Sequence, residues 1–150
     1  MHDFERQDSR QTLEQGIAEY HAKNPGLAAC RDPSSEAAAF FRCHDAVHVV
    51  FGCGNGLEDE AVVKLSNVFG TSGRFATLRG YRLHESRQIY RTLAVGEIFR
   101  VACAAFVLVP RTLWRCARMS RKWPWDGYDQ YLPMPLSEIR RSFGIRVSHG

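Results

Sequence analysis

Two histidines and two acids between residues 40 and 64 could together bind a metal ion. In the segment FFRCHDAVHVVFGCGNGLEDEAVVK, His44 and His48 are four residues apart and Asp45 follows the first histidine. Residues four apart on a helix lie on one face, so both imidazoles can reach one ion, as they do in HExxH sites. Glu60 follows His48 after eleven residues. The glycine-rich stretch between them predicts a turn that would bring its carboxylate back to the histidines.

The predicted metal ligands are therefore His44, Asp45, His48 and Glu60. Asp45 and Glu60 are also the candidate catalytic groups. Imidazoles and carboxylates suit zinc, iron or manganese, and an oxygen-rich variant would suit magnesium; of these we favour zinc. Two alternatives remain open, because buried histidines are often only hydrogen-bonded core residues, and because Cys43 or Cys53 could supply a ligand.

Helices must position these residues, since apolar side chains recur at helical spacing and strict strand alternation is absent. The pattern predicts helices over about residues 13–23, 32–51, 57–69, 75–90, 92–119 and 135–144. Pro110 should kink or split the fifth of them. We expect an all-α protein with one domain spanning residues 1–150, five to seven helices, and a metal site built on a helix, a glycine turn and a second helix.

Composition narrows the class of protein. The chain has 150 residues, of which 45% are hydrophobic and 24% charged, and this is typical of a globular domain. Five cysteines without a CxxC pair argue against a disulfide framework or a zinc ribbon and favour a reducing compartment. No apolar leader opens the chain, and its longest apolar stretch is about half of what a membrane span needs.

The metal motif resembles the signature HDxxH-x11-E of the fourth coenzyme Q biosynthesis protein family, here called the Coq-four family. HDAVH, eleven residues and then Glu60 reproduce it, and PLSEIRRSFGI (135–145) resembles the closing segment PLxxLRxxLGI of that family. The resemblance covers about residues 36–147. Residues 1–32 are divergent or shortened relative to the family pattern.

The resemblance implies a ubiquinone biosynthesis protein that binds a polyprenylated ring precursor and a divalent metal. It implies peripheral association with the cytoplasmic face of the inner membrane, other quinone-biosynthesis proteins as partners, and compatibility with a homodimer. The reaction attributed to the family, which we expect here, is removal of the C1 carboxyl of a prenylated hydroxybenzoate with oxidation at that carbon. A non-catalytic prenyl-lipid binder or assembly factor, and a soluble metallohydrolase, are the alternatives.

A long apolar segment with a basic end is the second feature of the sequence. Residues 92–109 predict either a core helix or the wall of a prenyl tunnel, in which Glu97 would pair with Arg100 or extend the metal site. Basic residues beside tryptophan suit an anionic membrane surface, although a solvated helix face is the alternative. The net charge of +4 and the lack of a motif argue against nucleic acid. The basic stripe consists of Arg111, Arg115, Arg118 and Lys122, with Trp114 among them.

Overall fold

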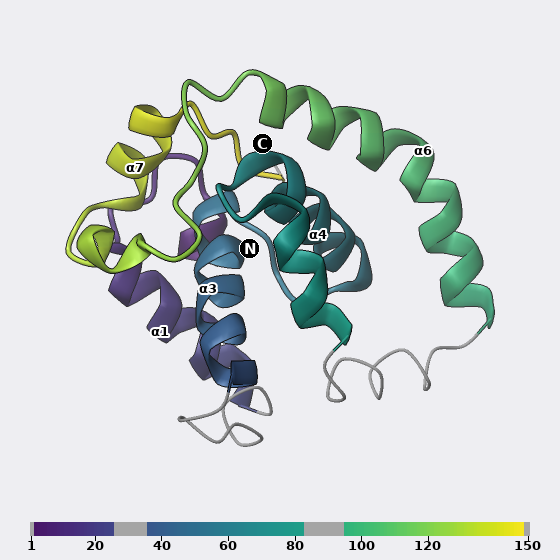
Figure 1. Cartoon of the computed structure of the whole chain (residues 1–150), viewed down its shortest axis with the longest axis horizontal. Helices are drawn as coiled ribbons and strands as arrows, with labels where there is room; N and C mark the ends of the chain where they lie inside the picture. Colours follow the sequence, from purple (N-terminus) through teal and green to yellow (C-terminus); the bar gives the residue numbers. More distant parts are fainter. Residues whose placement is uncertain (1, 26–35, 83–94, 149–150) are drawn as a thin grey trace.

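The computed structural model describes residues 2–25, 36–82 and 95–148, which are mostly helical (Figure 1). These ranges contain no strand, and the all-α prediction is confirmed. The α-helices are α1 (Leu13–Lys23), α3 (Glu36–Phe51), α4 (Leu57–Gly70), α6 (Val95–Ala117) and α7 (Leu136–Phe143). The 3₁₀ helices are η1 (Asp3–Glu5), η2 (Arg74–Arg82) and η3 (Tyr128–Tyr131).

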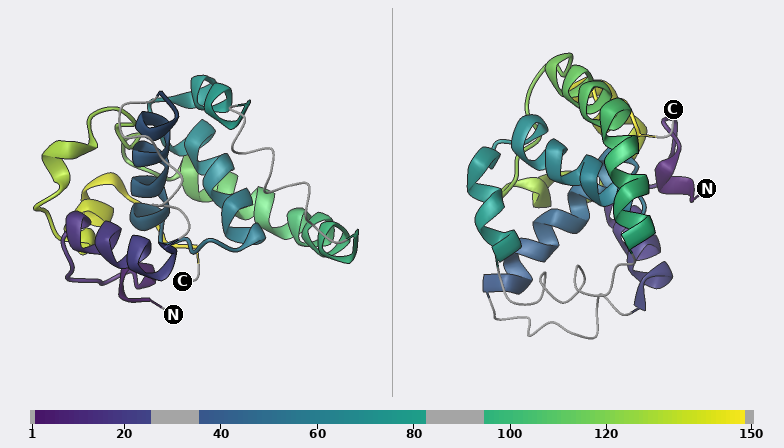
Figure 2. Two further views of the ribbon diagram at one scale, coloured as in Figure 1. Left: turned by 90° about the horizontal axis from the view of Figure 1, so that it is seen from below. Right: turned by 90° about the vertical axis from the view of Figure 1, so that its right-hand side faces the viewer.

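Helix α3 is the centre of the structure. Helices α1 and α4 both pack against it, and α4 in turn carries η2 and α6 (Figures 1 and 2). Ala46, Val47, Val49 and Val50 are completely buried, so the C-terminal half of α3 is enclosed on every side. A helix that is apolar nearly all round belongs in a core, and the polar side chains that α3 carries there must find partners.

The turn after α3 requires a glycine. Gly52 has a φ of +65°, in the left-handed region that glycine adopts without a Cβ clash. A Cβ at this position would lie 2.8 Å from Val147 Cγ1. The chain can therefore reverse sharply here and begin α4 at Leu57, as the sequence predicted.

Arg140 of α7 closes the C-terminal end of α3. Its guanidinium is buried and donates to the carbonyl oxygens of Val50 and Val49 at 2.9 and 2.8 Å, and also to those of Phe4 and Arg6. A cation is favourable beside the last carbonyls of a helix, where the dipole is negative. The segment PLSEIRRSFGI therefore anchors the helix that carries both histidines.

One element differs from the expectation. The described part of residues 75–90 is the 3₁₀ helix η2 and not an α-helix, and residues 83–90 lie outside the described residues. Helix α6 continues past Pro110, so the proline does not split it, and its ribbon arches over the molecule (Figure 1). Within the described residues, no helix is both long and apolar enough to cross a membrane.

Candidate metal centre

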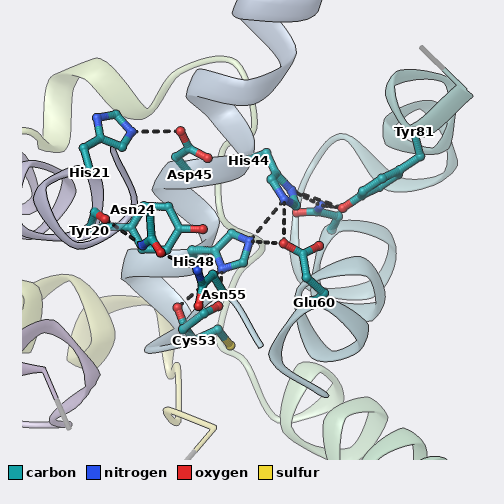
Figure 3. Close-up of polar contacts among 12 residues, drawn as sticks. Tyr20, His21, Asn24, His44, Asp45, His48, Cys53, Asn55, Glu60 and Tyr81 are labelled. Carbon is teal, nitrogen blue, oxygen red and sulfur yellow. Dashed lines mark hydrogen bonds and ion pairs between the residues drawn. The ribbon is translucent and has the colours of Figure 1, made fainter. Parts of the chain in front are cut away.

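His44, His48 and Glu60 bring three potential ligand atoms together beside α3 (Figure 3). His48 Nε2 lies 3.1 Å from His44 Nε2 and 3.2 Å from Glu60 Oε1. His44 Nε2 lies 3.8 Å from the same oxygen. Both imidazoles are buried, whereas the carboxylate is half-buried. The helix, glycine turn and helix thus bring these three residues together as the sequence predicted.

The donor set fits a divalent metal of the size of zinc. Zinc bonds to nitrogen and oxygen ligands are about 2.0–2.1 Å long, so two donors of a tetrahedral ion lie about 3.3 Å apart. The three separations of 3.1, 3.2 and 3.8 Å are close to that value. Three protein ligands also leave coordination positions for water or substrate. Imidazole and carboxylate donors also suit iron and manganese.

Hydrogen bonds orient both imidazole rings toward the shared point. His48 Nδ1 lies 2.8 Å from the carbonyl oxygen of Gly54, which can only accept, so this nitrogen carries the proton. His44 Nδ1 lies 3.1 Å from the Tyr81 hydroxyl and 3.3 Å from Asn67 Nδ2. In both rings Nε2 is left facing the other ligands. The Gly54 carbonyl thus fixes both the tautomer and the orientation of His48, as such partners do for metal-binding histidines.

The electrostatics of the three side chains are coupled. Burial opposes charge on Glu60, but its hydrogen bonds to His44 and His48 outweigh this and hold the pKa of Glu60 well below its usual range. Burial lowers the pKa of His44. Burial acts in the same direction on His48, but the bond to Glu60 and the nearby carboxylates raise its pKa overall. Without metal, one proton is therefore held on His48 between the three side chains.

The structure does not bring Asp45 into this cluster, contrary to its prediction as a metal ligand and catalytic group. Its carboxylate is turned toward α1 and lies 2.9 Å from His21 Nε2 (Figure 3). Neighbouring helix residues point about 100° apart, so the position beside His44 is what carries Asp45 away from the site.

Three residues that the sequence analysis did not assign to the site surround it. Asn67 and Tyr81 contact His44, and Asn67 Nδ2 donates to the Tyr81 hydroxyl at 2.6 Å. Lys64 is held 5.2 Å from the centre of the Tyr81 ring, and burial lowers its pKa. Lys64 and Asn67 follow Glu60 by four and seven residues. This helical spacing was the signal that could have revealed them.

The two cysteines near the motif are not part of the cluster. Burial raises the pKa of Cys43 to about 11 and that of Cys53 to about 12. Only a thiolate binds zinc, so both thiols are poorly suited as ligands. Cys53 instead donates weakly to the carbonyl oxygen of Phe51.

The residues of the predicted basic stripe do not all lie on one surface in the structure. Arg111 and Trp114 are exposed on α6, Arg118 is exposed just after the end of that helix, and Arg115 is partly buried. Lys122 lies after the helix and donates to the carbonyl oxygens of Phe69 and Cys116 at 2.6 and 2.9 Å, so it ties α4 to α6. The side chains of Glu97 and Arg100 lie outside the described residues.

Scans of protein-family models, curated proteins and solved structures find no match to this chain. The resemblance to the Coq-four family therefore rests on the two sequence motifs. The geometry of the metal cluster stands independently of that resemblance.

Proposed function

We propose that the protein binds a divalent metal ion, zinc in the first instance, through His44, His48 and Glu60 and acts in ubiquinone biosynthesis. The proposed metal site is supported by three potential ligand atoms that lie within 4.8 Å of one another. The pathway is supported by the HDxxH-x11-E spacing and the closing motif. The proposed reaction is removal of the C1 carboxyl from a polyprenylated hydroxybenzoate as CO₂, with oxidation at that carbon by dioxygen.

The residues around the centre suit an anionic aromatic substrate. A metal bound here would supply a Lewis acid toward a carboxylate or carbonyl oxygen. Lys64 would add a positive charge on the same face of α4, where it can orient the carboxyl of the precursor. Phe40 and Tyr81, whose ring centroids are 5.2 Å apart, supply aromatic surface next to His44. Aromatic walls with a few placed polar groups are typical of small-molecule sites.

Exposed apolar side chains support handling of a prenyl lipid and peripheral membrane association. Phe106 and Val107 of α6 are 85% and 65% exposed, and Phe75 of η2 is 66% exposed. Trp114 follows on the same helix. Aromatic and apolar side chains of an amphipathic helix enter the lipid interface in this way. The same feature favours the second candidate, a non-catalytic lipid-binding or assembly protein.

Complementation of a deletion strain tests the proposal. We expect the strain lacking the gene to accumulate a carboxylated prenyl precursor, wild type to restore ubiquinone, and Glu60→Gln to fail. The exposed Glu58→Gln on the same helix is the matched control and should restore ubiquinone. The metal content of each purified protein is measured in parallel, and only Glu60→Gln should lose the ion.

Each other outcome selects a different function. Restoration by a metal-free Glu60→Gln protein would exclude metal catalysis and favour the assembly role. Unchanged quinone profiles in the deletion strain would exclude the pathway and leave the soluble metallohydrolase. Purified wild type that binds no divalent ion would overturn the metal centre itself.

A further inference from the structure

An open groove lies between the C-terminal half of α6, helix α7 and the chain that follows α7. Its volume is about 930 Å³, within the range of small-molecule sites. Arg115 Nη1 donates to the carbonyl oxygen of Ser148 at 3.0 Å, and Ser120 N donates to that of Phe143 at 3.0 Å, so hydrogen bonds join its walls. None of the three metal ligands lines the groove.

The groove is strongly basic. Arg111 and Arg115, four residues apart on α6, and Arg118, just after the end of that helix, line one side of it. The opposite wall contributes three more arginines, and one acid, Asp8, lines the groove. Asp8 is itself paired with Arg6 at 3.5 Å. The arginines of the opposite wall are Arg140, Arg141 and Arg146.

These arginines differ in what they can offer a ligand. The guanidinium of Arg140 is committed to backbone carbonyls at the end of α3. Arg118 lies over the Trp114 ring at 4.8 Å, a cation–π contact that holds its guanidinium at the groove. Arg141 and Arg146 are exposed on the facing wall. A ligand between the walls can therefore meet guanidinium groups from both sides.

Mutual repulsion favours an anion in this position. Burial and the charge of Arg111 both lower the pKa of Arg115, which shows that the cations are close enough to disfavour one another. An anion between them would relieve this repulsion. Guanidinium groups donate paired N–H bonds that match phosphate oxygens.

We propose that this groove binds the phosphate groups of a small molecule. The site goes beyond the proposed function and does not depend on the metal. Its concave shape and its basic residues on facing walls suit an enclosed ligand better than a flat membrane surface. Lys122, which the stripe was expected to include, is absent from the lining because it is bound to α4.

Titration calorimetry of the full chain with inorganic pyrophosphate tests the site. We expect saturable one-site binding that weakens as salt is raised, since the contacts are ionic. The double variant Arg118→Gln/Arg141→Gln should weaken binding about tenfold or more, because it removes a charged donor from each wall. The double variant Arg74→Gln/Arg79→Gln, at two exposed arginines of η2, makes the same charge change outside the groove and should bind as wild type.

Two further measurements distinguish binding in the groove from binding at the metal centre and from binding to lipid. Glu60→Gln should keep its pyrophosphate affinity, and loss of binding in that variant would place the anion at the metal centre and overturn the proposal. Sedimentation with phosphatidylcholine vesicles containing phosphatidylglycerol is the second measurement. Vesicle binding that the double variant abolishes, in a protein that does not bind pyrophosphate, would assign the arginines to lipid and also overturn it. Circular dichroism confirms that each variant is folded.

Discussion

His48 holds a proton at the point where a metal would bind. Its Nδ1–H is fixed on the carbonyl of Gly54, so a second proton on Nε2 is shared with Glu60 and His44. A metal ion must displace this proton, because a coordinating imidazole has to be neutral. The three side chains could therefore hold either a proton or a metal ion.

Zinc affinity should consequently depend on pH. Despite burial, the hydrogen bond to Glu60 raises the pKa of His48 above its ordinary value, so below that raised pKa a proton on His48 competes with the ion. We expect the dissociation constant to increase about tenfold for each pH unit below that pKa and to level off above it. Calorimetric zinc titrations across neutral and mildly acidic pH measure the profile. Asp59→Asn, an acid-to-amide change next to Glu60 on α4, is the control, and its zinc affinity should depend on pH as that of wild type does. A wild-type zinc affinity that does not change with pH would contradict the shared proton.

Asn67 contacts the outer ring nitrogen of His44, and only one end of its side-chain amide has a hydrogen-bond partner among the described residues. Its Nδ2 donates to the Tyr81 hydroxyl, whereas its buried Oδ1 has no hydrogen-bond partner among the described residues. When Nε2 of His44 binds metal, Nδ1 must carry a proton and needs an acceptor. A flip of the amide would present Oδ1 to it, since the two ends of an amide have nearly the same shape.

We expect Asn67→Leu to weaken zinc binding about 10- to 100-fold, the usual cost of losing a partner of a metal-binding histidine. Asn67→Asp keeps an acceptor and should retain most of the affinity. Competition with a chelating dye measures both constants. Equal affinity of Asn67→Leu and wild type would show that Asn67 does not orient His44.

At the scale of elements, the histidine helix and the helix that returns Glu60 could be predicted because their signals are local. The i, i+4 spacing and the glycine turn lie within one short segment, and α4 begins at Leu57 as expected. The direction of Asp45 could not be predicted in the same way, since it depends on His21 of α1, 24 residues earlier. Trp123 and Trp125, which follow the basic stripe in the sequence, are buried in the core.

The position of η2 against α3 also depends on a distant contact. A Cβ on Gly80 would lie 2.1 Å from Phe40 Cδ2, so only glycine allows η2 to approach α3 this closely. Phe40 is stacked on His44 with ring centroids 5.7 Å apart. Tyr81, which follows Gly80, also contacts His44. The close approach of η2 to α3 therefore determines which side chains surround His44.

Gly80→Ala should therefore push η2 away from α3. We expect a loss of about 1–3 kcal/mol in the free energy of unfolding, as for other overpacked sites, together with weaker zinc binding as Tyr81 leaves His44. Gly127→Ala is the control, since its Cβ would meet ordinary contacts of 3.7 Å. Urea unfolding and zinc titration provide the two readouts, and a stable Gly80→Ala protein with normal affinity would contradict the coupling.

At the scale of the whole molecule, both ends of the described chain meet at the end of α3. Arg140 contacts the carbonyl of Phe4 136 positions earlier and that of Arg6 134 positions earlier. Burial lowers the pKa of Arg140 to about 10, so the guanidinium remains charged at neutral pH. One side chain thus joins η1, α3 and α7.

Arg140→Met should leave buried carbonyl oxygens without donors. We expect a loss of about 3 kcal/mol or more in the free energy of unfolding, because several acceptors lose their partner at once. The exposed Arg141→Met should change stability by less than about 0.5 kcal/mol. Urea unfolding of both variants checks this, and similar midpoints for the two would show that the carbonyls are satisfied in another way.

The anchoring of α3 by Arg140 also has a consequence while the chain is being synthesised. His44, His48 and Glu60 leave the ribosome together, well before Arg140 is synthesised. Until Arg140 follows, the carbonyl oxygens at the end of α3 have no guanidinium to accept from and face water. The three side chains that could hold an ion are therefore present before the helix that carries two of them is anchored.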